Sequence, residues 1–304
     1  MNNQKIYLYG MILASSSFLL KSGFLKPDAY SEIETKYRLP GGETGTCATV
    51  LASLGANVTI DGNHIGANVA PLIKEFYKDK PVNLDSLYFD ESYDGLEDYI
   101  VIADDIRSPM GTFDHFFSNG EKRWNEQKED DIINCDVAAI DPFFQEQSQR
   151  AAELCVKYKK PYVAIDCRYE SFIHQNAAVS IISGEGIHNN YPGKTREELF
   201  PLFKESSDGL TIITNGGKDL MYGRKGSELK VFKPYKVNVV STLGAGDSFK
   251  AGCVYAFSMD MSDDEIIQFA SACSAVAISR FPLPLNPPTL AEIKKIMKSR
   301  MSVS

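Results

Sequence analysis

The sequence predicts an α/β fold with a mostly parallel central sheet, helices on both faces and a small additional β-sheet. Short apolar segments typical of buried strands alternate with helical patterns over most of the 304 residues. Two stretches, about 17–38 and 97–124, contain extended segments that fall outside this alternation. We expect them to form a separate small sheet that acts as a lid. No linker or internal repeat is visible, so residues 1–304 are predicted to be one domain.

The individual elements follow from hydrophobic pattern and turn residues. Gly55 is expected to end the first helix, and the Asn119-Gly120 pair predicts a hairpin turn within the strand-like stretch 113–124. Residues 236–240 are rich in strand-forming residues. The predicted strands of the main sheet are 6–9, 58–60, 137–140, 162–165, 178–182 and 211–214, and the predicted helices are 46–54, 69–77, 147–158, 247–259 and 263–279.

Composition narrows the class of protein. The net charge is −8 and no long block of Lys or Arg occurs, so the basic surface of a nucleic-acid binder is not expected. The apolar run after Lys5 is interrupted by Gly10 and by serines 15–17, and no stretch reaches the ~20 apolar residues of a membrane span. We therefore expect a cytoplasmic protein without membrane association. Its six cysteines form no C-x-x-C pair and are expected to be reduced, buried thiols.

The most informative stretch is 241–249, which reads STLGAGDSF and precedes an apolar helix. Gly244 and Gly246 allow a sharp backbone turn, after which the amides of Ala245, Gly246 and Asp247 would point outward at a helix N-terminus. Such a terminus binds anions through its amides and its dipole. A carboxylate at Asp247 could then accept a proton from a substrate hydroxyl while a phosphoryl group is transferred. The alternative interpretation is an ordinary capped helix start.

The order of several motifs resembles the PfkB (ribokinase-like) carbohydrate kinase family. The sequence T-x-G-A-G-D at 242–247 is similar to the C-terminal signature of that family, and G-G-E-T-G-T-C-A at 41–48 resembles its N-terminal glycine pair and helix. Residues 117–124 resemble its lid hairpin, and 214–216 its nucleotide loop. The resemblance implies a three-layer ribokinase-like fold with a small β-sheet lid, ATP and Mg²⁺ as cofactors, and Asp247 as the general base, with Gly244, Ala245 and Gly246 completing the catalytic loop.

The resemblance also implies an acceptor site. Gly41 and Gly42 would lie beneath the acceptor, and Ser15, Thr46 and Asp247 would contact it. Ser15 stands where the family usually has Asp, and Thr46 where it usually has Asn. A hydroxyl can still donate and accept a hydrogen bond, but it reaches less far and carries no charge. We therefore expect the acceptor to be held differently from ribose or fructose.

The remaining residues implied by the resemblance concern the nucleotide and metal. Thr214, Gly216 and Thr242 would contact the nucleotide, and so would Ser271, which lies in a helix of small residues that could equally serve close packing. Glu185 would act on Mg²⁺ through water. Ser241 replaces an Asp that helps to bind a monovalent cation in some relatives, which makes a strong potassium requirement unexpected.

Two further residues have open interpretations. Asp166 and Arg168 follow a strand, where the resemblance implies a strand-end Asp with a nearby Arg, and they could equally form a solvated ion pair.

Three functions remain open from the sequence. The first is an ATP-dependent kinase of a sugar or sugar-like polyol. The second is a nucleoside kinase of the same fold, which would use an aromatic slot for the base. The third is a non-catalytic ligand-binding descendant, favoured by the departures at Ser15, Thr46 and Ser241 and opposed by the intact 244–247 loop. A homodimer formed through the lid is compatible with all three.

Overall fold

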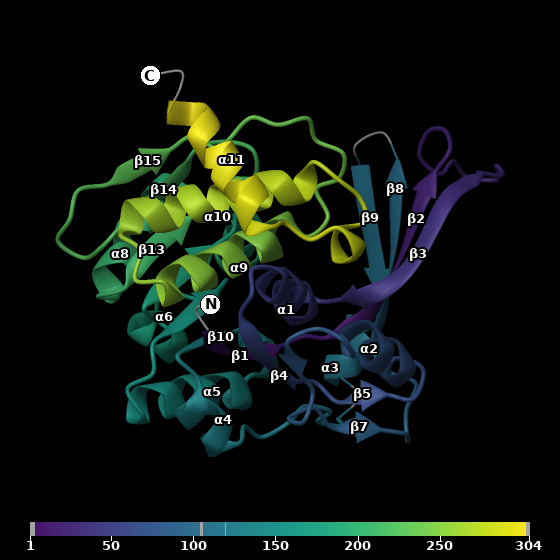
Figure 1. Cartoon of the computed structure of the whole chain (residues 1–304), viewed down its shortest axis with the longest axis horizontal. Helices are drawn as coiled ribbons and strands as arrows, with labels where there is room; N and C mark the ends of the chain where they lie inside the picture. The colour runs from purple at the N-terminus through teal and green to yellow at the C-terminus, as the bar shows by residue number, and fades with distance from the viewer. Residues whose placement is uncertain (1–3, 104–105, 119, 302–304) are drawn as a thin grey trace.

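A computed structural model describes residues 4–103, 106–118 and 120–301. Within these residues, nine strands form the main sheet in the order β15-β14-β13-β12-β11-β10-β1-β4-β6. In this order, the neighbouring strands from β13 across the sheet to β6 pair in parallel. Strands β14 and β15 add an antiparallel edge next to β13. Helices cover both faces, which gives three layers, and a smaller sheet projects beside them (Figure 1). The predicted three-layer ribokinase-like fold class is confirmed.

The element bounds are as follows. The strands of the main sheet are β1 Lys5–Gly10, β4 Asn57–Gly62, β6 Val82–Asn83, β10 Val137–Ile140, β11 Tyr162–Ile165, β12 Val179–Ile182, β13 Leu210–Ile213, β14 Leu220–Gly223 and β15 Lys230–Phe232. The helices are α1 Glu43–Ser53, α2 Ala70–Tyr77, α3 Phe113–Ser118, α4 Glu129–Asn134, α5 Glu146–Lys157, α6 Phe172–Asn176, α7 Gly184–Asn190, α8 Arg196–Ser206, α9 Ala245–Ser258, α10 Asp263–Ile278 and α11 Leu290–Met301.

The side-chain alternation of β1 explains the two covered faces. Ile6 and Leu8 point into a core shared with α1, α9 and α10, whereas Tyr7 and Tyr9 point into a core shared with α4 and α5. Successive side chains of a strand face opposite sides, so a strand with two buried faces is apolar throughout. The central position of β1 therefore follows from its sequence pattern.

The smaller sheet, called the lid here, consists of β2 Leu13–Leu20, β3 Ile33–Gly41, β8 Glu97–Ala103 and β9 Ile106–Gly111. Its order is β3-β2-β8-β9, separate from the main sheet (Figure 1). The predicted small sheet is thus present. The stretch 17–38, which looked irregular, supplies the second half of β2 and most of β3, and these two strands pair antiparallel.

Two sequence predictions about extended structure are wrong. Residues 113–118 form helix α3 instead of a hairpin strand, because Phe113, Phe116 and Phe117 pack together against Trp124 and Phe144. Asn119 of the expected turn lies outside the described residues. Residues 233–240 form no strand, and Val239 and Val240 are exposed there. Residues with high strand propensity form a strand only where a neighbouring strand can pair with them, and this segment has no such neighbour. Among the described helices, none has the length and apolar character needed to cross a membrane.

Candidate active site

The start of helix α9 forms the centre of the candidate site. Gly244 caps the helix with φ of 77°, a left-handed conformation that favours glycine. The amide of Ala245 donates to the Thr242 carbonyl at 3.2 Å, so this predicted anion donor is engaged within the loop. Within the described residues, the amides of Gly246 and Asp247 have no backbone acceptor of this kind. These two amides are the ones available to an anion.

The N-terminus of α1 meets the start of α9. Gly42 also has a φ of 77°, and a Cβ there would lie 2.4 Å from the Met11 carbonyl oxygen, so a side chain has no room. Thr46, in the first turn of α1, brings its methyl group within 3.3 Å of the position a Cβ would take on Gly244. Two helix N-termini and two glycine turns therefore converge, and their dipoles together favour bound negative charge.

Two carboxylates, Asp247 on α9 and Glu43 on α1, lie near enough at this junction for the charge of Asp247 to act on Glu43. The pKa of Asp247 is raised to about 7, chiefly by burial and also by the charges of Asp141 and Asp166, while Lys250 and Arg107 lower it. Burial and the charge of Asp247 raise the pKa of Glu43 to about 8. A carboxylate whose pKa lies near neutrality can both accept and return a proton, which is the property of a general base. Glu43 was not among the residues that the sequence predicted.

A fully buried ion pair lies beneath Asp247. Lys250, one turn further along α9, donates to Oδ1 of Asp141, which follows β10. Thr44 on α1 donates to Oδ2 of the same carboxylate at 2.9 Å. Lys250 and Asp141 are both 0% exposed. Sequence reasoning missed this triad, although a lysine inside the apolar α9 pattern and the Asp141-Pro142 pair after a strand were visible signals.

The lid contributes a second group of residues at the acceptor side. Ser15 on β2 is register partner to Asp98 on β8, and a Cβ on Gly41 would lie 2.7 Å from the Ser15 Cβ. Burial raises the pKa of Asp98, and the Ser15 hydroxyl partly offsets this. Within the described residues, Oδ1 of Asp98 is buried without a hydrogen-bond partner. The lid thus brings a carboxylate next to Ser15 that the sequence analysis did not identify.

Two of the residues predicted to contact a nucleotide, Thr214 and Gly216, follow β13 at the carboxyl edge of the parallel strands. Thr214 follows β13, and its amide donates to the Ile182 carbonyl at 2.8 Å. Gly216 is exposed with a φ of 55°, and Thr242 is exposed as well. Ser271 is 5% exposed and lies on α10, which packs closely against α9. Open α/β sheets bind ligands at this edge.

Close packing accounts for the small residues of α10. A Cβ on Gly252 of α9 would lie 2.7 Å from the Cα of Ala270. The contact role of Ser271 stays a prediction.

Asp166 and Glu185 lie beside this edge. Both oxygens of Asp166 accept hydrogen bonds from Ser183, from its amide at 2.6 Å and from its hydroxyl at 2.9 Å. Arg168 contacts Glu170 instead of Asp166, so the predicted solvated pair of 166 and 168 is wrong. Glu185, on α7, is exposed and near enough to raise the pKa of Asp166. In this structure Asp166, at the end of its strand, therefore anchors Ser183.

The side chains near the candidate site could bind Mg²⁺ only together with water and substrate phosphates. Within the described residues, no group of three or more His, Cys, Asp or Glu side chains could hold a metal ion. Mg²⁺ commonly keeps several waters and binds through one or two carboxylates together with substrate phosphates. The exposed carboxylate of Glu185 fits binding of Mg²⁺ through water and phosphates.

The six cysteines are free and buried, as predicted.

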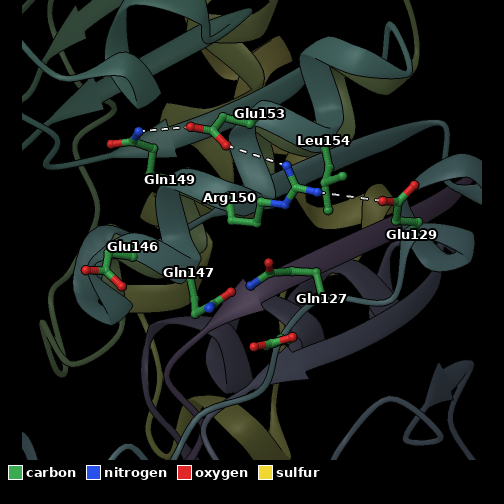
Figure 2. A pocket seen from close by; sticks show the side chains of 9 residues that line it. Gln127, Glu129, Glu146, Gln147, Gln149, Arg150, Glu153 and Leu154 are labelled. Carbon is green, nitrogen blue, oxygen red and sulfur yellow. Dashed lines mark hydrogen bonds and ion pairs between the residues drawn. The ribbon is translucent and has the colours of Figure 1, made fainter.

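A surface pocket of about 530 Å³ lies elsewhere, along α5 and the segment before α4. Figure 2 shows Arg150 between Glu153 and Glu129, with Gln127 and Gln147 at its floor. None of its lining residues belongs to the junction of α1 and α9. The pocket is lined mostly by charged and amide side chains and carries no part of the candidate site.

Comparison with known proteins agrees with this geometry. Residues 185–288 match the family model described as pfkB family carbohydrate kinase. A putative ribokinase from Agrobacterium tumefaciens superposes with a TM-score of 0.88 at 15% identity, covering 99% of both chains. The chain therefore has a ribokinase-like fold, and its C-terminal part, residues 185–288, is similar to pfkB family carbohydrate kinases.

Two other relatives refine the comparison. The chain is 36% identical over 93 residues to 1-phosphofructokinase of Haemophilus influenzae, which is 30% of each protein. Arabidopsis thaliana ribokinase, solved with ribose and ATP, superposes with a TM-score of 0.80 at 16% identity over 97% of this chain and 99% of that one. The sequence alignments span about a third of the length of the curated relatives. The structural likeness at this identity concerns the fold.

Proposed function

We propose that this protein transfers the γ-phosphoryl group of ATP to a hydroxyl of a sugar or sugar-like small molecule, with Asp247 as the general base. The observation that carries this proposal is the partly buried Asp247 carboxylate, whose pKa is about 7, at the junction of two helix N-termini. The anion-binding amides and the proton acceptor are within one turn of the same helix. Phosphoryl transfer needs both groups at one place.

In this mechanism the ionised Asp247 accepts the proton of the acceptor hydroxyl as the hydroxyl oxygen attacks the γ-phosphorus. The bond from that phosphorus to the bridging oxygen breaks, and ADP leaves with the electron pair. The amides of Gly246 and Asp247 hold the charge of the transferring group, together with Gly244 and Ala245, which set the turn. Magnesium supplies charge neutralisation at the phosphates, and Glu185 would orient it through water.

The remaining predicted residues have proposed binding roles. Ser15, Gly41, Gly42 and Thr46 contact the acceptor, and the position of Asp98 opposite Ser15 adds a carboxylate for its hydroxyls. The nucleotide contacts are assigned to Thr214, Gly216, Thr242 and Ser271. A cytoplasmic location fits the six free thiols, which need a reducing compartment. A homodimer through the lid would cover exposed apolar side chains such as Ile33, Ile106 and Met110.

A screen for acceptor-dependent ADP release tests the proposed function. Wild-type protein and Asp247→Asn are compared on sugars, polyols and nucleosides with ATP and Mg²⁺. Turnover of a sugar or polyol by the wild type alone is the expected result. Turnover of nucleosides only would favour the nucleoside kinase. ATP binding without acceptor-dependent ADP release on any panel member would favour the non-catalytic alternative.

A further inference from the structure

The apolar pattern of helix α9 is interrupted by a buried lysine. Lys250 follows Asp247 by three residues, so the two side chains are neighbours on one face of the helix. Phe249, Lys250 and Ala251 are all buried, and the Lys250 side chain is 0% exposed. A lysine is almost never fully buried without a partner of opposite charge. The lysine therefore lies one turn beyond the candidate base, and its partner decides where its charge is held.

The partner of Lys250 is fixed by three other elements. Nζ of Lys250 donates to Oδ1 of Asp141, which follows β10, and the Thr44 hydroxyl on α1 donates to Oδ2 at 2.9 Å. The amide of Asp141 donates to the Tyr9 carbonyl of β1 at 2.9 Å. A Cβ on Gly10 would lie 2.0 Å from Oδ2 of Asp141, so the carboxylate fills the space at the end of β1. The buried pair thus ties α9 to α1, β1 and β10.

The charged groups around Asp247 come from several elements: Lys250 on α9, Glu43 on α1, Arg107 on β9, and Asp141 and Asp166 after β10 and β11. Burial raises the pKa of Asp247, and among the neighbouring charges Lys250 has the largest effect, which lowers it. Arg107 is the other cation among the described groups that act on Asp247, and it is exposed, so water screens its charge more strongly. Lys250 is therefore the buried cation that offsets the carboxylates around the base.

We propose that Lys250 is a positioning residue for the proposed reaction: held by Asp141, it places a permanent positive charge beside Asp247 and keeps that carboxylate ionised for proton transfer. This inference rests on the proposed function. Three observations carry it: the place of Lys250 one turn beyond Asp247, its complete burial, and the fixed pair with Asp141.

The chemistry of the base gives this lysine a task. A carboxylate accepts a proton only in its ionised form, and burial beside other carboxylates favours the protonated form. Burial lowers the pKa of Lys250, but the charge of Asp141 outweighs burial and holds that pKa above its usual range, so Lys250 stays charged. Within the described residues, Nζ of Lys250 bonds Asp141 and makes no hydrogen bond to Asp247. The lysine thus acts on the base without occupying the oxygens that would accept the proton.

The test follows the protonation of Asp247 and needs no substrate. Protein labelled with ¹³C at its aspartate carboxyl groups is titrated by NMR, and the Asp247 signal is assigned by its absence in Asp247→Asn. The double variant Lys250→Met with Asp141→Asn makes both members of the pair neutral and leaves no unpaired charge buried. Because Lys250 outweighs Asp141 in its effect on Asp247, the titration midpoint should rise by about 1 pH unit.

Two control variants keep the wild-type midpoint. Lys250→Arg retains the buried charge, so it should titrate like wild type. Lys157→Met removes a cation from the exposed pair with Glu129 on the surface and should also leave the midpoint unchanged.

Asp141→Asn alone gives a second measurement with the opposite sign. It removes an acid and keeps the lysine, so the midpoint of Asp247 should fall below that of wild type. A general loss of structure would not move the midpoint in opposite directions in the two variants. A midpoint of the double variant at or below that of wild type, or a midpoint of Asp141→Asn at or above it, overturns the inference. Either variant decides the question if the other does not fold.

Kinetics separates the inference from the function on which it rests. With an acceptor found in the screen, the acid limb of kcat/KM should shift with the midpoint in the double variant, which is about 10-fold lower kcat/KM below both midpoints and little change at high pH. A loss that is equal at every pH would show a structural role only and overturn the inference while the proposed function stands. If wild type turns over no acceptor, the proposed function fails and the inference fails with it, whatever the titration shows.

Discussion

The phosphate loop at the start of α9 and the lid differ in how much of their chemistry is carried by local sequence. The loop is continuous in the chain, and residues 185–288 around it match the family model. The lid is assembled from β2 and β3 and, after a long separation, from β8 and β9. Its polar residues Ser15 and Asp98 become neighbours only through strand pairing. Under the proposed function, the loop would therefore carry the phosphoryl transfer, and the lid would select the acceptor.

The largest expected effect concerns the loop. Asp247→Asn should lower kcat by ~10²–10⁴, because a general base is removed. Nucleotide affinity should change little, since the amides of the loop remain. Steady-state kinetics on an acceptor from the screen, with calorimetry for Mg·ADP, checks both. A variant that keeps more than half of the wild-type kcat would assign the base to another group.

The second expected effect concerns the buried ion pair between Lys250 and Asp141. Lys250→Met leaves the Asp141 carboxylate buried and without its cation, which typically costs about 3–5 kcal/mol in the free energy of unfolding. The control is Lys157→Met, which removes a cation from the exposed pair with Glu129 and should cost about 1 kcal/mol or less. Chemical denaturation of both variants measures the difference. Equal effects would mean that the buried pair contributes no more than a surface pair.

The third effect concerns the lid. Asp98→Asn should raise KM for the acceptor by about 10-fold and leave KM for ATP unchanged, if Oδ1 binds an acceptor hydroxyl. The neighbouring Glu97→Gln is the control, because Glu97 is already paired with Arg38. Kinetics with both substrates varied distinguishes the two constants. Equal KM values for the acceptor in both variants would remove Asp98 from the acceptor site.

The smallest expected effect is the influence of Asp247 on how protein stability depends on pH. The pKa of Asp247 is raised from 3.8 to about 7 in the folded protein, so the folded state favours the protonated form. This contribution to stability is fully present below about pH 4 and is lost as the pH rises through 7. Asp247→Asn should therefore raise Tm by a few degrees at pH 8 and have little effect at pH 4.

Activity should show the opposite dependence on pH. The base must be ionised, so kcat/KM should fall as the pH drops below about 7. Differential scanning calorimetry and a pH–rate profile measure the two trends. A variant less stable than wild type at pH 8 would contradict the raised pKa of Asp247.

Local sequence determined much of the fold. The strands at 137–140 and 162–165 were predicted with the bounds that the structure shows, because four consecutive apolar residues between polar turns have one stable arrangement in a parallel sheet. The start of helix α9 was also predictable, since Gly244 and Gly246 allow the turn within a few residues of Asp247. These features depend on neighbours in the chain.

Tertiary structure alone decided the rest. The aromatic residues of 113–124 are compatible with a strand or a helix, and packing of Phe116 and Trp124 against the core selected the helix at 113–118. Lys250 and Asp141 are 109 residues apart, and Arg107 and Thr242 are 135 apart. No local pattern encodes such contacts, because they exist only after α9 and the lid have been placed against the sheet. The sequence by itself therefore determined the glycine turn that begins α9, and the packing of distant segments determined the charges that surround it.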